Sequence, residues 1–108
     1  MAFWGIEVKP NSPYTCQLDP GVKLHISQAT LGLGSSTRRS ILKGAAKNKC
    51  AVFLCSLMLG NKCSCKLNLE LNSNDEVTFS VVGPQSIHLS GFLTTITTSD
   101  IDSRIKIQ

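Results

Sequence analysis

The sequence predicts an all-β domain, either an antiparallel sandwich or a jelly roll. Three observations favour this fold class: apolar and polar residues alternate with a period of two in most segments, turn-forming residues recur about every ten positions, and the 3.6-residue periodicity of a helix is missing. The chain has 108 residues, of which 42% are hydrophobic and 17% charged. This composition suits a single domain with a real core, and the chain is too short for two domains of ordinary size.

The first part of the chain contains two predicted strands. Residues 4–9 alternate apolar with polar or small side chains, and the alternation returns over residues 22–27, after the turn residues 19–21. Trp4 is in phase with the apolar positions, so we expect its indole to fill the core and not to form an aromatic platform for a ligand. A loop rich in glycine and serine follows at residues 32–36.

The run from Cys50 to Leu59 is apolar without clean alternation. Its length is about half of the ~20 residues that a membrane-spanning helix needs, so we expect no membrane association through it. As a strand it would be covered on both faces, by the core of its own domain and by a partner subunit. The run therefore belongs in a protein interior or an interface.

The clearest alternation lies in residues 65–72, where one face is apolar and the other wholly polar. The turn cluster at residues 72–75 and the renewed alternation over residues 77–81 predict a hairpin. The final stretch, residues 94–108, is only weakly patterned. We therefore expect a folded core over residues 1–93 and an extension over residues 94–108.

No catalytic site, metal site or cofactor is predicted. Cys63 and Cys65 lack a second closely spaced pair of ligands, and on a strand both would face inward as small hydrophobic side chains. His25 and His88 are the two histidines, and neither is accompanied by a nucleophile elbow or a metal-binding helix motif. We interpret both as side chains on the polar face of a strand.

Charge and cysteine content exclude further classes. The formal net charge of +4 is mild, and we expect its one cluster to be solvated loop or edge charge and not a nucleic-acid site; the cluster comprises Arg38, Arg39, Lys43, Lys47 and Lys49. The number of cysteines, five, is odd, and the N-terminus has no apolar leader, which predicts reduced thiols in the cytosol or nucleus.

Four segments, in this order, resemble the nucleoplasmin-like domain at the N-terminus of plant FKBP-type immunophilins. They are "FWGIEVKP" at residues 3–10, "LHISQATLGLG" at 24–34, "LNLEL" at 67–71 and "GPQSIHLSGF" at 83–92. The chain is more distantly similar to animal nucleoplasmin and to plant nucleolar histone deacetylase-type proteins. By this resemblance the last segment is a strand near the end of the fold, with Ile87 and Leu89 inward and His88 outward.

The resemblance implies an eight-stranded jelly roll that assembles into a ring-shaped pentamer, or into a decamer of two such rings, and acts as a histone chaperone in the nucleus, including the nucleolus. A ring needs an apolar side surface on every protomer. The candidate interface residues are Val52, Phe53, Leu54, Leu57 and Met58. Nothing in the chain resembles an FKBP domain, so we expect no isomerase activity and no other enzymatic activity.

Two departures from the family limit what the resemblance implies. Family chaperones carry long acidic tracts, whereas this chain is net basic, so the candidate histone contacts are few: Glu70, Asp75 and Glu76. The alternative is a purely structural pentamerisation module whose histone contacts lie in acidic segments elsewhere. In deacetylase-type relatives a histidine placed like His25 has been suggested as catalytic with an acidic partner, but here that acid aligns with Lys66, so we expect no deacetylase activity.

Overall fold

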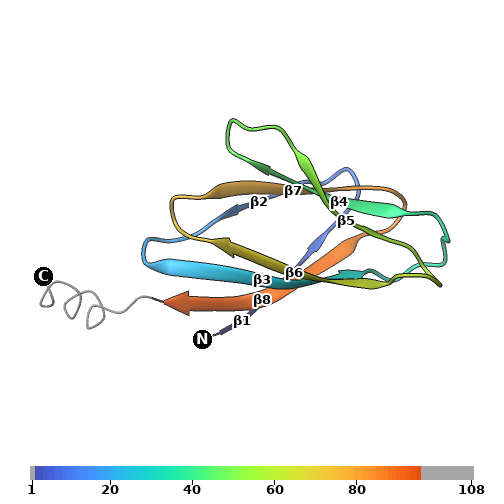
Figure 1. The fold of residues 1–108 in the computed structure, drawn as a ribbon, viewed down its shortest axis with the longest axis horizontal. Helices are drawn as coiled ribbons and strands as arrows, with labels where there is room; N and C mark the ends of the chain where they lie inside the picture. Colours follow the sequence, from blue (N-terminus) through green and yellow to red (C-terminus); the bar gives the residue numbers. More distant parts are fainter. Residues whose placement is uncertain (1, 96–108) are drawn as a thin grey trace, which may run out of the picture.

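Eight strands form two facing antiparallel sheets in the computed structural model, which describes residues 2–95 (Figure 1). The strands are β1 (Ala2–Val8), β2 (Tyr14–Gln17), β3 (Val22–Leu31), β4 (Ser40–Ala46), β5 (Val52–Leu57), β6 (Ser64–Leu71), β7 (Glu76–Val82) and β8 (Ile87–Thr95). Of the predicted extension over residues 94–108, Thr94 and Thr95 belong to β8 and the rest lies outside the described residues. Among residues 2–95, no helix is long and apolar enough to cross a membrane.

The order of the strands is that of a jelly roll. The first sheet runs β1-β8-β3-β6 and the second runs β2-β7-β4-β5. The antiparallel pairs β1 with β8, β2 with β7, β3 with β6 and β4 with β5 are those of a long hairpin rolled up on itself. The predicted all-β jelly roll is therefore confirmed.

The predicted hairpin between residues 65–72 and 77–81 is wrong. Both segments are strands, but β6 lies in the first sheet and β7 in the second, so the turn between them crosses from one layer to the other. The turn residues specify a reversal of the chain and not the layer in which it ends. Leu71 and Val81 both face the core, which an arch between two sheets allows as readily as a hairpin within one.

The core lies between the two sheets and draws on strands of both. Its largest fully buried side chains are Phe79, Leu24, Ile26, Leu42, Leu57, Ile87 and Leu89. Burial of a side chain of this size contributes about 1.5–3 kcal/mol. Ile87 and Leu89 face inward and His88 outward, as predicted, and Trp4 packs against the core while staying partly exposed.

A β-bulge in β3 shifts the alternation of its side chains. The register with both β6 and β8 skips Ser27, so Ile26 and Ala29 face the core although they are three residues apart. Opposite the bulge, Gly91 of β8 pairs with Ile26, and a Cβ atom at this glycine would overlap the carbonyl oxygen of His25. The two strands approach closely here because position 91 has no side chain.

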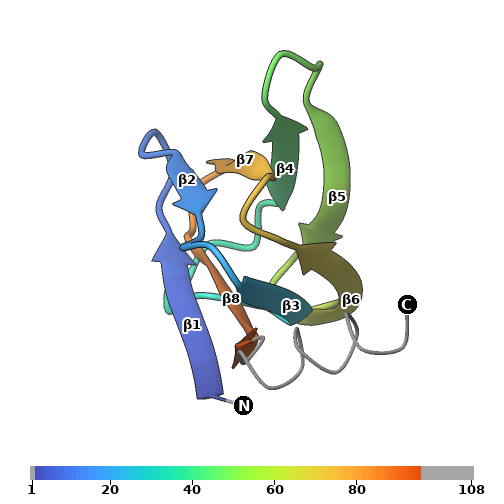
Figure 2. The same ribbon diagram turned by 90° about the vertical axis from the view of Figure 1, so that its left-hand side faces the viewer.

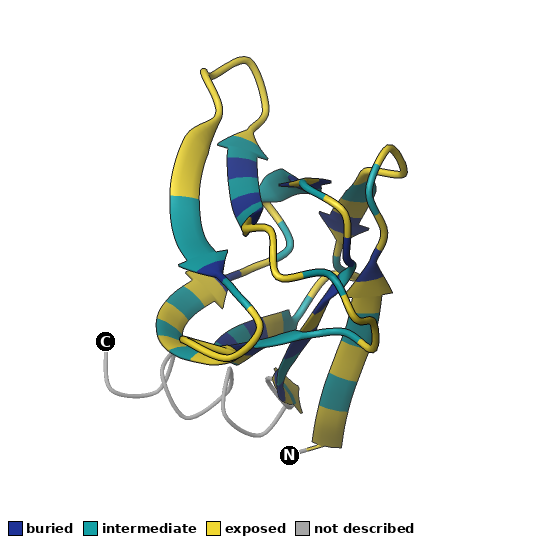
Figure 3. Cartoon of the chain, turned by 90° about the vertical axis from the view of Figure 1, so that its right-hand side faces the viewer, coloured by how far each residue is buried: buried dark blue, intermediate teal, exposed yellow. Residues whose placement is uncertain are grey.

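The β4–β5 hairpin projects beyond the body of the sandwich (Figures 2 and 3). All eight residues from 46 to 53 are exposed, whereas residues 54–58 are half-buried or buried. Within one protomer the run from Cys50 to Leu59 is therefore covered only in its second part, and cover of its first part by a partner subunit stays a prediction. β5 is an edge strand of the second sheet, and the two residues at its N-terminal end, Val52 and Phe53, are exposed.

Candidate functional site

An exposed apolar surface lies where β5 and β6, the edge strands of the two sheets, face each other. We call this surface, formed by Val52, Phe53 and Leu54 of β5 and Leu69 of β6, the apolar edge. Val52 is 58% exposed and Phe53 is 74% exposed. Edge strands of soluble proteins are normally protected by charge or by a covering element, so an apolar edge strand of this kind is typical of an interface.

An apolar hollow of about 200 Å³ opens at this edge between the two sheets. Val52 and Leu54 line it from β5, Leu69 from β6, and Phe79 forms part of its inner wall. The space exists in part because Gly44 has no side chain: a Cβ atom there would come within 2.9 Å of Cδ1 of Leu54. The core of the sandwich is thus open to a side chain from outside.

The five predicted interface residues differ in how far they are exposed. Val52 and Phe53 are exposed, and Leu54 is half-buried beside them. Leu57 is fully buried within its own protomer, so it is a core residue and drops out of the candidate surface. Met58 is half-buried and forms an isolated bridge with Lys62 at the far end of β5.

The three predicted histone contacts do not form one acidic patch. Glu70 lies on the outer face of the first sheet with its side chain 79% exposed. Asp75 stabilises the β6–β7 turn, because its Oδ2 accepts a hydrogen bond of 2.9 Å from the backbone N–H of Asn72. Glu76 begins β7 in the second sheet, and its Oε2 lies 3.6 Å from Nζ of Lys47. Of these three carboxylates, that of Glu70 is the most exposed.

His25 has an acidic neighbour that the sequence alignment missed. The β3–β6 register pairs His25 with Glu70 and Gln28 with Lys66, and Nδ1 of His25 lies 3.8 Å from Oε1 of Glu70. The expectation that Lys66 leaves this histidine without an acid is wrong, because Glu70 and not Lys66 is the cross-strand neighbour of His25. The imidazole also stacks on Phe92, with ring centroids 6.0 Å apart and an interplanar angle of 17°.

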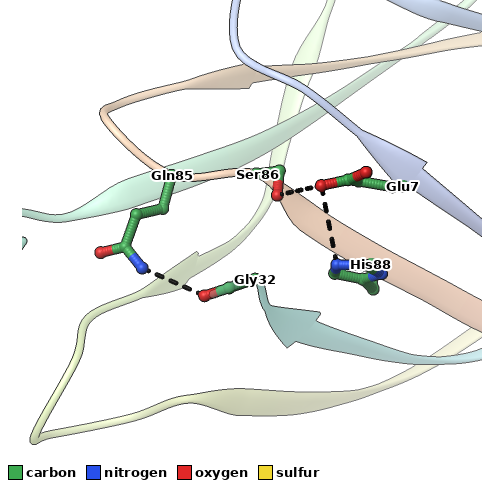
Figure 4. A network of polar contacts seen from close by, with 5 residues as sticks. All are labelled: Glu7, Gly32, Gln85, Ser86 and His88. Atoms are coloured by element: carbon green, nitrogen blue, oxygen red, sulfur yellow. Dashed lines mark hydrogen bonds and ion pairs between the residues drawn. The ribbon is translucent and has the colours of Figure 1, made fainter. Parts of the chain in front are cut away.

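His88 also pairs with a carboxylate on the outer face of the first sheet. Its Nε2 lies 3.8 Å from Oε2 of Glu7, and the same oxygen accepts a hydrogen bond of 2.7 Å from the hydroxyl of Ser86 (Figure 4). This arrangement agrees with the prediction of a strand-face histidine.

The five basic residues of the predicted cluster are spread along β4 and its flanking loops. Arg38 and Arg39 precede the strand, Lys43 lies within it, and Lys47 and Lys49 follow it in the β4–β5 turn. Those in the loops are exposed, as predicted for solvated charge.

The cysteines differ in exposure. Cys65 is half-buried and packs against the core as predicted, but Cys63 is exposed, so its predicted inward orientation is wrong; it precedes β6 and lies in the turn that leads into the strand. Within residues 2–95, no group of three His, Cys, Asp or Glu side chains is arranged to hold a metal ion.

We expect the thiols to react with iodoacetamide in two groups at pH 9. Burial, with a smaller contribution from the nearby Cys65 thiol, raises the pKa of Cys55 to about 11, and burial also raises the pKa of Cys16. Because the thiolate is the reactive form, both should be alkylated far more slowly than the exposed Cys50 and Cys63. Peptide mass spectrometry over time measures this. Equal labelling of Cys55 and Cys63 in the folded protein would contradict the placement of Cys55.

The fold defines a small all-β jelly-roll domain with an exposed apolar edge. The chain belongs to the nucleoplasmin-like domain family, whose model matches residues 3–94. It is 47% identical over 96 residues to the peptidyl-prolyl cis-trans isomerase FKBP53 of Arabidopsis thaliana, covering 86% of this chain and 20% of that protein. The residues described are the nucleoplasmin-like domain, whereas the FKBP catalytic domain lies in longer relatives.

Two further relatives extend the comparison. The 46 kDa FK506-binding nuclear protein of Spodoptera frugiperda is 29% identical over 91 residues, which cover 84% of this chain and 22% of the relative. Histone deacetylase HDT2 of Zea mays is 30% identical over 108 residues, which cover all of this chain and 31% of the relative. The chain thus spans between a fifth and a third of the length of these relatives.

Two solved structures share the fold. The nucleoplasmin-like N-terminal domain of Drosophila FKBP39 superposes with a TM-score of 0.74 at 25% identity, over 90% of this chain and 92% of that one. The Drosophila NLP core, whose structure concerns pentamer formation and histone binding, also has a TM-score of 0.74, at 20% identity, over 88% of this chain and 100% of that one.

Proposed function

We propose that this chain is the oligomerising core of a nuclear histone chaperone of the FKBP-associated, nucleoplasmin-like type. The observation that carries the proposal is the apolar edge, where Val52 and Phe53 leave large apolar side chains in water beside an open hollow. A ring of identical protomers buries such a surface once per contact. The pentamer and histone binding described for the Drosophila core, and the nuclear name of the insect relative, support the assembly, the partner and the location.

Light scattering coupled to gel filtration tests the assembly. We expect a mass near five times 11.7 kDa, or near ten times if two rings pair. The mass should persist at high salt, because apolar burial and not surface charge holds the contact. A stable species of 11.7 kDa would remove the ring and with it this proposal.

We expect histone binding to depend on local carboxylates, because the chain as a whole carries a net charge of +4. Glu70→Lys combined with Glu76→Lys should weaken binding of H2A–H2B by about tenfold at moderate salt, mainly through slower association. Asp75→Asn is tested as a separate variant. It removes the charge at position 75, but the side-chain oxygen of the asparagine can still accept the turn hydrogen bond from Asn72. Titration of labelled H2A–H2B measures the effect. Unchanged affinity in the double variant would show that these carboxylates are not the contact.

The alternative function is a structural pentamerisation module, and it is favoured by the dispersion of the three acidic candidates over two sheets. Such a module would form the ring but would not bind H2A–H2B or H3–H4 at moderate salt. The histone titration on the ring therefore separates the two functions directly.

A further inference from the structure

A second hollow lies on the outer face of the first sheet, over β1 and β8. It has a volume of about 360 Å³, and we call it the Phe3–Glu7 hollow; its lining residues are Phe3, Gly5, Ile6, Glu7, His88, Leu89 and Ser90. The apolar edge lies elsewhere, on β5 and β6, whereas β1 is the opposite edge strand of the first sheet.

The floor of the hollow is a glycine between two larger side chains. Phe3, Gly5 and Glu7 lie on one face of β1 because side chains alternate along a strand. The Phe3 ring is 79% exposed and leans over the glycine, since a Cβ atom at Gly5 would lie 3.5 Å from Cε2 and Cζ of the ring. The absence of a side chain at position 5 leaves an aromatic wall and a carboxylate facing the same space.

The carboxylate of Glu7 is held in place before any ligand arrives. Its Oε2 accepts a hydrogen bond of 2.7 Å from Ser86 and lies 3.8 Å from Nε2 of His88, whereas Oε1 has no partner among the described residues (Figure 4). Ser86 is itself fixed, because its carbonyl accepts a hydrogen bond of 2.8 Å from the N–H of Gly32.

Gln85, the residue before Ser86, further fixes the position of the β7–β8 turn. Gln85 is buried, its Nε2 donates to the carbonyl of Gly32 at 3.1 Å, and its backbone N–H donates to Oγ of Ser40 at 3.2 Å. The β7–β8 turn that carries Ser86 is thus tied to the loop after β3 and to the start of β4. One carboxylate oxygen is anchored by this network and the other is free to accept a hydrogen bond.

We propose that the Phe3–Glu7 hollow binds the cationic side chain of a lysine or arginine in a basic protein segment. Glu7 is the one carboxylate that lines it, no Lys or Arg lines it, and the His88 imidazole lies beside the oxygen of Glu7 that is already bonded to Ser86, so the free oxygen is left for a cation. A cation there gains a charge-assisted hydrogen bond to the free oxygen and a cation–π contact with Phe3. The identification of the segment as part of a histone rests on the proposed function, but the chemistry of the hollow does not.

Fluorescence anisotropy tests the site with a labelled peptide of lysine and arginine in a glycine–serine background. The control peptide carries norleucine and citrulline in place of the cations, which preserves length and bulk. We expect the cationic peptide to bind the assembled protein at low ionic strength and the neutral peptide to bind at least about tenfold more weakly. Equal binding of the two peptides, or no binding of the cationic one, would overturn the proposal.

Two variants test the location of the site, one by removing the charge and the other by filling the space. Glu7→Gln removes the charge and should weaken the cationic peptide by about tenfold, whereas Gly5→Thr keeps the charge but fills the floor and should weaken it by about fivefold or more. Threonine suits an exposed strand position better than glycine, so the second variant should fold at least as stably as the parent. Asp19→Asn, which removes one exposed carboxylate elsewhere, is the matched control and should leave binding within about twofold.

The outcomes separate this site from diffuse attraction and from the proposed function. If Glu7→Gln and Asp19→Asn weaken the peptide equally, or if Gly5→Thr has no effect, the hollow is not the site. If the peptide binds as expected but H2A–H2B does not bind the ring, the hollow stands and the chaperone function fails. If H2A–H2B binds equally to the parent and to Gly5→Thr, the chaperone function stands and the hollow is not its histone contact.

Discussion

Replacement of Gly91 by alanine should lower the free energy of unfolding by about 3 kcal/mol, at the upper end of the usual cost of overpacking. The added methyl group would overlap the carbonyl oxygen of His25 and press on the backbone at Ile26. Neither obstacle is the flexible end of a side chain, so β8 must move away from β3 in the middle of the first sheet. Urea unfolding followed by circular dichroism measures the change.

The matched control is Gly5→Ala on the neighbouring strand β1. A Cβ atom there meets the carbonyl oxygen of Leu89 at 3.4 Å and the ring of Phe3 at 3.5 Å, which are ordinary contacts. We expect a change within about 0.5 kcal/mol, as for most exposed positions. Equal losses in the two variants would show that the close approach at Gly91 is not what makes glycine necessary there.

The second large effect is expected for assembly. Val52→Lys combined with Phe53→Lys should convert the oligomer into a protomer of 11.7 kDa, because each contact in the ring would have to bury two unpaired ammonium groups. Both side chains are exposed in the protomer, so the fold itself should tolerate the change. Light scattering and circular dichroism together distinguish dissociation from unfolding.

Leu33→Lys serves as the control for this experiment. Leu33 is fully exposed in the loop after β3, so its replacement adds a charge at an apolar surface position away from the apolar edge. We expect the oligomer of the Leu33→Lys variant to have the same mass as that of the parent protein. An unchanged mass in the Val52 and Phe53 variant would place the subunit contact on another face.

The strands that sequence analysis predicted are those whose inward positions are consistently apolar. Residues 65–72 and 77–81 alternate cleanly, and all of them except Asn72 lie in β6 or β7. β4 was missed because its inward positions are Ser40, Leu42 and Gly44, of which one is polar and one has no side chain. β2 was missed because it has four residues, too few to show a period.

The parts of the candidate sites that escaped prediction depend on pairing between distant segments. The His25–Glu70 contact follows from the β3–β6 register, and alternation within either strand carries no information about that register. The Phe3–Glu7 hollow depends in the same way on the pairing of Glu7 with His88, whose strands lie at opposite ends of the chain. The apolar run predicted that residues 50–59 contain a strand. Its position at the edge of a sheet could not be predicted, because that position depends on the order of the strands.

The rolled strand order has a consequence for how the chain reaches its fold. β4 and β5 are neighbours in sequence and in their sheet, whereas each further pair joins more distant segments, up to Ala2 with Leu93. Folding that begins at the central hairpin and proceeds outward would therefore close its longest loop last, and domains rich in such non-local pairs fold in roughly milliseconds to seconds. During translation β1 emerges first, yet it has no strand partner until β8 has left the ribosome, so the nascent domain carries an unpaired first strand through most of its synthesis.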